Sequence, residues 1–95
     1  MYIVRETFTA KPGMASKLAN LFKDVVSSGQ TRMKTRVLTD AVGPFNTVVL
    51  ETEVAELADF EKIMKEYAER ADIRERMKGY ADLYVSGGRE IYRVV

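Results

Sequence analysis

Apolar and polar side chains alternate at the start of the chain, which is the pattern of a β-strand with one buried face. Residues 2–10 are rich in β-branched and aromatic types. A strand over them places Tyr2, Val4 and Phe8 on one face, whereas the other face receives Ile3, Arg5, Thr7 and Thr9. We therefore predict a first strand whose two faces differ in polarity.

The next apolar residues recur at intervals of three and four, the spacing of one helical face. They follow a break at residues 11–13, where Pro12 suits the first turn of a helix because its missing N–H would have no intrahelical partner. Ser27, Ser28 and Gly29 mark the end of this helix. The predicted stripe consists of Met14, Leu18, Leu21, Phe22 and Val25.

Residues 34–40 and 45–54 combine β-branched side chains with alternation, so both are predicted to be strands. Gly43 and Pro44 lie between them, and a short hairpin loop there makes the pair antiparallel.

A second helix is predicted over residues 56–70, where apolar residues again gather on one side between charged neighbours. Continued to Tyr84, it would be longer than a domain of this size needs, so we expect a break near residues 71–72. Asp72 and Glu75 have the spacing of an N-capping box and predict a new, short helix. Gly79 or the pair Gly87-Gly88 would end it.

The last strand is predicted over residues 89–95, and Ser86-Gly87-Gly88 before it reads as a turn. The order of elements, strand, helix, strand, strand, helix, strand, predicts an α+β ferredoxin-like βαββαβ fold. In it, a four-stranded antiparallel sheet has both helices on one face. Residues 1–95 are expected to form a single domain.

The uncovered face of such a sheet should be polar in a monomer, yet here it also receives apolar residues. The candidates for a dimer interface are Ile3, Phe45, Val49 and Ile91, with Tyr92 as the alternative to Ile91. We therefore predict a homodimer that covers this face. The alternative is that these residues lie at strand ends under loops.

Charged residues within the strands need partners. Arg5 and Glu6 lie on a central strand, and the expected partners on neighbouring strands are Glu51, Glu53 and Arg93. A ladder of ion pairs is favoured over a catalytic carboxylate.

The charges are balanced and interspersed: 15 basic and 14 acidic residues leave a net charge of +1. We expect no nucleic-acid partner, and we interpret Arg32, Lys34 and Arg36 as a solvated strand edge. No apolar run is long enough to cross a bilayer, and residues 1–5 lack the pattern of a secretory signal, so a soluble, cytoplasmic protein is expected.

The chain contains no Cys, no His and no Trp. Thiolate catalysis, disulfides and the serine–histidine dyad are therefore excluded, as are the usual ligands of zinc and haem. We expect neither a metal nor a cofactor.

The layout resembles that of the dimeric α/β-barrel superfamily, in particular NIPSNAP-like and antibiotic-biosynthesis-monooxygenase-like proteins. The resemblance rests on Lys11-Pro12-Gly13 opening the first helix, the hairpin at Gly43-Pro44-Phe45, the helix break near Ala71-Asp72 and the terminal Glu90-Ile91-Tyr92-Arg93. It implies two ferredoxin-like subunits that pair their sheets into a barrel. Members include cofactor-free oxygenases, haem-degrading enzymes and isomerases. The histidine on which haem-handling members rely and the tryptophan that the cofactor-free oxygenases commonly use are absent here.

A pocket is expected between the sheet and the helices or at the mouth of the barrel, where apolar walls meet a few polar groups. A tyrosine would donate a hydrogen bond to a ligand oxygen, Asn46 would donate or accept, and Arg36 would hold a carboxylate or an enolate. The alternative is that the tyrosines are ordinary core residues. The candidate residues are Arg36, Asn46, Tyr67, Tyr80 and Tyr84.

Three functions remain open at this point. We favour a homodimer that binds a small organic molecule. A cofactor-independent monooxygenase or isomerase acting on an aromatic or enolisable substrate is the second possibility, and a structural or protein-interaction module is the third.

Overall fold

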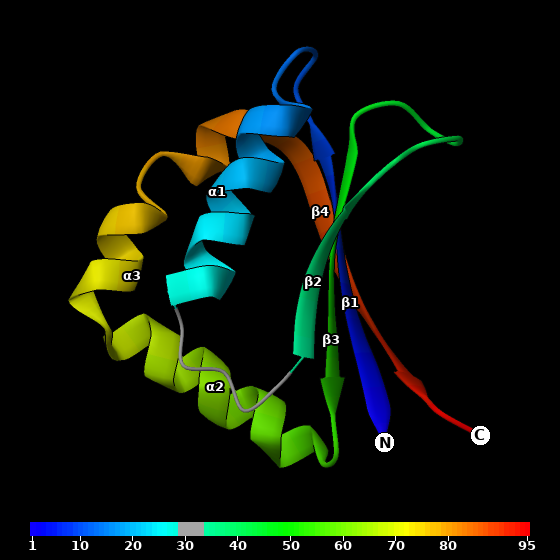
Figure 1. Cartoon of the computed structure of the whole chain (residues 1–95), viewed down its shortest axis with the longest axis vertical. Coiled ribbons are helices and arrows are strands. Elements are labelled where there is room, and N and C mark those ends of the chain that lie inside the picture. Colours follow the sequence, from blue (N-terminus) through cyan, green and yellow to red (C-terminus); the bar gives the residue numbers. More distant parts are fainter. Residues whose placement is uncertain (29–33) are drawn as a thin grey trace.

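The computed structural model describes residues 1–28 and 34–95, so the predictions made for Gly29 and Arg32 lie outside the described residues. Its strands form one antiparallel sheet in the order β2-β3-β1-β4, and the helices lie on one side of it (Figure 1). The predicted α+β ferredoxin-like arrangement is confirmed. The elements are β1 (Tyr2–Ala10), α1 (Ala15–Ser28), β2 (Lys34–Thr39), β3 (Thr47–Val54), α2 (Leu57–Glu69), α3 (Ala71–Arg76), the 3₁₀ helix η1 (Tyr80–Leu83) and β4 (Tyr84–Arg93).

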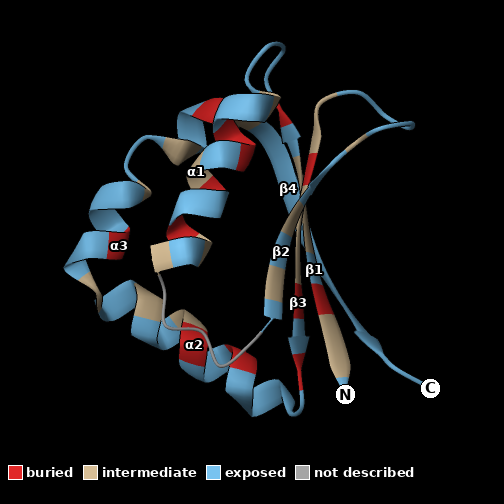
Figure 2. Cartoon of the chain, viewed as in Figure 1, coloured by how far each residue is buried: buried red, intermediate tan, exposed pale blue. Residues whose placement is uncertain are grey.

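The hydrophobic core under the helices is divided into two clusters. Val4 and Val48, from the two central strands, are fully buried, and each belongs to a different cluster. Figure 2 shows the buried positions on the inner strands and on the helices, while β4 is exposed along nearly its whole length. The first cluster consists of Ala10, Leu18, Ala19, Phe22, Val48 and Leu83, and the second of Val4, Val54 and Phe60.

The helix termini differ from the prediction in two places. Pro12 is not helical: Gly13 has a φ of 79°, which makes residues 11–13 a turn, and α1 begins only at Ala15. The predicted cap at Asp72 is wrong because its carboxylate pairs with Arg70 instead. A capping interaction occurs at the start of α2, where the backbone N–H of Glu56 donates to Asp59.

The break between the second and third helices is confirmed. Arg70 is extended (φ −87°, ψ 117°) between α2 and α3, so the chain turns there instead of continuing as one helix. None of the helices within residues 1–28 and 34–95 is long and apolar enough to span a membrane.

Strand β4 begins earlier than predicted, because residues 86–88 are part of it and not a turn. Gly87 pairs with Phe8, and a Cβ added at Gly87 would lie 2.9 Å from Cδ1 of that ring. Because Gly87 has no side chain, the ring of Phe8 can pack closely against it. In a sequence, a glycine pair with this role looks the same as a glycine pair in a turn.

Candidate ligand-binding site

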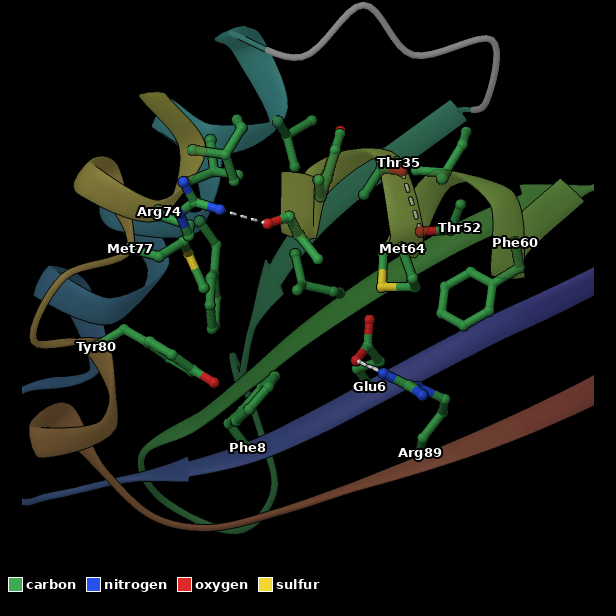
Figure 3. A pocket seen from close by; sticks show the side chains of 18 residues that line it. Glu6, Phe8, Thr35, Thr52, Phe60, Met64, Arg74, Met77, Tyr80 and Arg89 are labelled. Atoms are coloured by element: carbon green, nitrogen blue, oxygen red, sulfur yellow. Dashed lines mark hydrogen bonds and ion pairs between the residues drawn. The ribbon is translucent and has the colours of Figure 1, made fainter. Parts of the chain in front are cut away.

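A cavity of about 420 Å³ lies between the sheet and the helices. This volume falls within the roughly 300–1,000 Å³ of pockets that hold small organic molecules. Phe22 from the first core cluster and Phe60 from the second both line it, so the cavity occupies the space that separates the two clusters. Its walls also include Phe8, Leu50, Ile63, Met64 and Met77 (Figure 3).

One end of the cavity is aromatic. The rings of Phe8 and Phe22 are 5.0 Å apart between centroids, and those of Phe22 and Tyr80 are 6.4 Å apart. These separations belong to favourable tilted aromatic contacts, which hold the side chains in place without polar partners. Tyr80 therefore extends a fixed aromatic wall and ends it with a hydroxyl group (Figure 3).

The polar centre of the cavity is an ion pair between the central strand β1 and the edge strand β4. Glu6 on β1 and Arg89 on β4 are direct cross-strand partners, which brings both side chains to the helix-covered face. Nη2 and Nε of Arg89 donate to Oε2 of Glu6 at 2.8 and 3.3 Å. The guanidinium also lies 5.0 Å from the ring centre of Phe60, so Arg89 links the carboxylate to the apolar wall.

The remaining polar side chains of the cavity make contacts of their own. The hydroxyls of Thr35 and Thr52 share a hydrogen bond of 3.0 Å. Arg74, on α3 at the edge of the cavity, donates to the backbone oxygen of Ala68 at 2.9 Å. Because these groups are hydrogen-bonded within the protein, they make the cavity wall more polar without providing a reactive group.

Two tyrosine hydroxyls belong to the site. Burial raises the pKa of Tyr80, and the neighbouring Tyr84 and Glu6 act in the same direction. Burial is also the main cause of the raised pKa of Tyr67. Both hydroxyls consequently keep their protons near neutral pH and are available as hydrogen-bond donors.

The structure brings together two of the five residues proposed from the sequence. Tyr67 and Tyr80 line the cavity, whereas Tyr84 lies behind Tyr80, with 5.6 Å between ring centroids. Asn46 sits in the loop before β3 with a φ of 64°, and its backbone oxygen accepts from Ala10. Arg36 is on the opposite face of the sheet, bound to Glu51.

One signal in the sequence points to Glu6, a cavity residue that is not among the five predicted ones. Glu6 alternates in step with Val4 and Phe8 on a central strand, so its charged side chain lies on the same, buried face as theirs. Its partner was expected among Glu51, Glu53 and Arg93, and is instead Arg89.

Solved structures share this architecture over almost the whole chain. An uncharacterised NIPSNAP domain protein from Burkholderia xenovorans has a TM-score of 0.83 at 11% identity, over 100% of this chain and 95% of that one. A NIPSNAP family protein from Agrobacterium tumefaciens has a TM-score of 0.84 at 13% identity, over 99% and 85%. The chain shares the fold of these two proteins.

An antibiotic-biosynthesis-monooxygenase-like protein from Chloroflexus aurantiacus has a TM-score of 0.75 at 12% identity, over 99% of this chain and 92% of that one. The sequence itself matches no protein-family profile and no curated protein sequence. The resemblance to NIPSNAP-like and monooxygenase-like proteins is thereby confirmed at the level of the fold.

A second surface of interest is the sheet face that the helices leave open. The pairing registers place Arg36, Glu51, Arg5 and Glu90 in one row across all four strands, with charges that alternate in sign. Glu51 binds both arginines, Arg36 through Oε1 and Arg5 through Oε2. The row is therefore an ordered ladder of charges.

Apolar residues flank this row on the same face. Ile3 and Val49, two of the residues proposed for a dimer interface, lie there, together with Leu38 and Tyr92. Ile91 does not, because it pairs with Val4 and so belongs to the helix-covered face. Phe45 precedes β3 in the loop, where its side chain is exposed.

Proposed function

We propose that this protein binds a small, largely apolar organic molecule in the cavity between the sheet and the helices, and that it acts as a homodimer. The observation that carries the first part is the cavity itself: about 420 Å³ of space, bounded by aromatic and aliphatic side chains, between two otherwise well-packed clusters. A protein interior without a ligand function is normally filled to the density of an organic crystal.

The walls suit a ligand rather than solvent. Burying about 200 Å² of apolar ligand surface contributes roughly 5 kcal/mol before the costs of association are subtracted. Met64 and Met77 add flexible, polarisable side chains, which adapt to the outline of a bound molecule.

A purely apolar probe tests this proposal without involving the polar groups. We expect 1-methylnaphthalene to bind the wild-type protein saturably in equilibrium dialysis, at one molecule per chain. Leu50→Trp, which fills the cavity from its floor on β3, should weaken binding about tenfold or more.

Leu57→Trp is the matched control, since Leu57 is exposed at the start of α2 and is not part of the cavity wall. It should bind like the wild type. Equal affinity in all three proteins would place the probe elsewhere and contradict the proposal.

The open sheet face supports the second part, the homodimer. Its central row reads positive, negative, positive, negative from β2 to β4. A second copy related by a two-fold axis parallel to the strands would present the same row in the reverse order. Each charge of one copy would then face an opposite charge of the other. The same arrangement would bury Ile3, Leu38, Val49 and Tyr92 from both copies.

A further inference from the structure

Glu6 uses only one of its two carboxylate oxygens. Both contacts from Arg89 end on Oε2, and within residues 1–28 and 34–95 no hydrogen bond reaches Oε1. Figure 3 shows this second oxygen pointing away from Arg89, toward Met64 and the interior of the cavity. The Glu6 side chain is only 18% exposed, and Oε1 remains accessible to a molecule that enters the cavity.

The other polar groups of the cavity do not occupy this oxygen in the described residues. Thr35 and Thr52 are bonded to each other, and Arg74 donates to the carbonyl of Ala68. The hydroxyls of Tyr67 and Tyr80 also line the cavity, but neither donates to Glu6. Oε1 of Glu6 is thus a strong hydrogen-bond acceptor inside an apolar space, and the chain provides it with no donor in the described residues.

The charges around the cavity restrict what the donor can be. The negative charge of Glu6 is compensated by Arg89, and Arg74 leaves one further positive charge at the edge. An ammonium group would be repelled by the two guanidinium groups, and a carboxylate would meet the carboxylate of Glu6. An uncharged donor avoids both costs.

We infer that the ligand of this cavity is an uncharged, largely apolar alcohol whose hydroxyl group donates its proton to Oε1 of Glu6. This inference rests on the proposed function and adds the chemical class of the ligand. The ring or chain of the alcohol lies against Phe22, Phe60 and Met64, and the single hydroxyl fixes its orientation.

Four compounds that share one ring system test the inference: 1-naphthalenemethanol, its methyl ether, 1-naphthoate and 1-naphthylmethylammonium. In equilibrium dialysis at neutral pH, the alcohol should bind the wild-type protein about tenfold or more tightly than the ether, which has no proton to donate. Both ions should bind more weakly than the alcohol.

Glu6→Gln identifies the acceptor. In this variant the amide oxygen takes the Arg89 contacts and the NH₂ group faces the cavity, so a donor replaces the acceptor. The preference for the alcohol over the ether should fall to about onefold, because both compounds can accept from the amide. Glu61→Gln, an exposed position on α2, is the matched control and should keep the wild-type preference.

The outcomes separate the two proposals. Equal binding of alcohol and ether by the wild type, or tightest binding of either ion, overturns the inference even if 1-methylnaphthalene binds and the proposed function stands. A preference that persists in Glu6→Gln also overturns it. If neither 1-methylnaphthalene nor any compound of the series binds, the proposed function fails and the inference fails with it. The wild-type comparison needs no variant, so it decides the matter even if Glu6→Gln does not fold.

Discussion

Glu51 is the residue whose ion pairs connect neighbouring strands on the open face of the sheet. Its side chain is only 11% exposed, although it lies on the face that the helices leave uncovered. The hydrogen bond from Arg36 is the main cause of its lowered pKa, and Arg5 adds to the effect while burial opposes it. One carboxylate therefore ties β2 and β1 to β3.

This lowered pKa predicts a dependence of stability on pH. Because the pKa of Glu51 is lower in the folded chain than in the unfolded one, its contribution is complete above the ordinary glutamate pKa and is lost as the pH falls through the lowered value. Urea unfolding at pH 7 and at about pH 3 should therefore show a smaller loss of stability in Glu51→Gln than in the wild type.

Glu61→Gln, which removes an exposed carboxylate with no ion pair among the described residues, should lose as much stability on acidification as the wild type does. An identical loss in Glu51→Gln and the wild type would show that the two arginines do not stabilise the ionised form of Glu51.

At the scale of residues, the sheet face on which each strand side chain lies was predictable, whereas the partner of each charged side chain was not. Alternation along residues 2–10 assigns each side chain to a face, and Arg5 does bind Glu51, one of the three partners expected for the charged residues of this strand. The pairing of Glu6 with Arg89 depends on the register between β1 and β4, which are the two ends of the chain. The expected partner Arg93 instead lies over the ring of Tyr2, at 5.6 Å from its centre.

At the scale of elements, the β-sheet has one face that the helices cover and one face that they leave open. Val49 lies at the centre of the open face on β3, between its cross-strand neighbours Thr7 and Leu38. If a second copy covers this face, a charge placed at Val49 would be buried without a partner.

Light scattering after size exclusion should accordingly give twice the subunit mass for the wild-type protein, and Val49→Lys should shift it to the mass of one subunit. Val42→Lys serves as the control, since Val42 is fully exposed in the loop before β3. A wild-type protein that elutes as a single subunit at tens of micromolar would contradict the dimer.

The elements themselves were largely predictable because their signals are local. The helix break at Arg70 and the hairpin before β3 follow from length and from glycine and proline positions. The start of β4 was missed, because Gly87 owes its place to the ring of Phe8 on another strand. Local patterns do not contain such contacts.

At the scale of the whole molecule, the space between the two core clusters is the decisive feature. The same helical periodicity that predicts Phe22 and Phe60 as core residues does not reveal that they face a cavity instead of each other. That depends on how far α2 and α3 stand from the sheet (Figure 1), which no local pattern along the chain encodes. The fold could be predicted from the sequence, whereas the site needed the structure.

Mapping a bound probe onto the chain tests the central claim most directly. Amide chemical shifts of the isotopically labelled protein, recorded with increasing 1-methylnaphthalene, should change most around Phe22, Met64 and Met77, whose side chains line the cavity. Changes centred on Val49 and Tyr92, or no saturable change anywhere, would contradict the claim that the space between sheet and helices is a binding site.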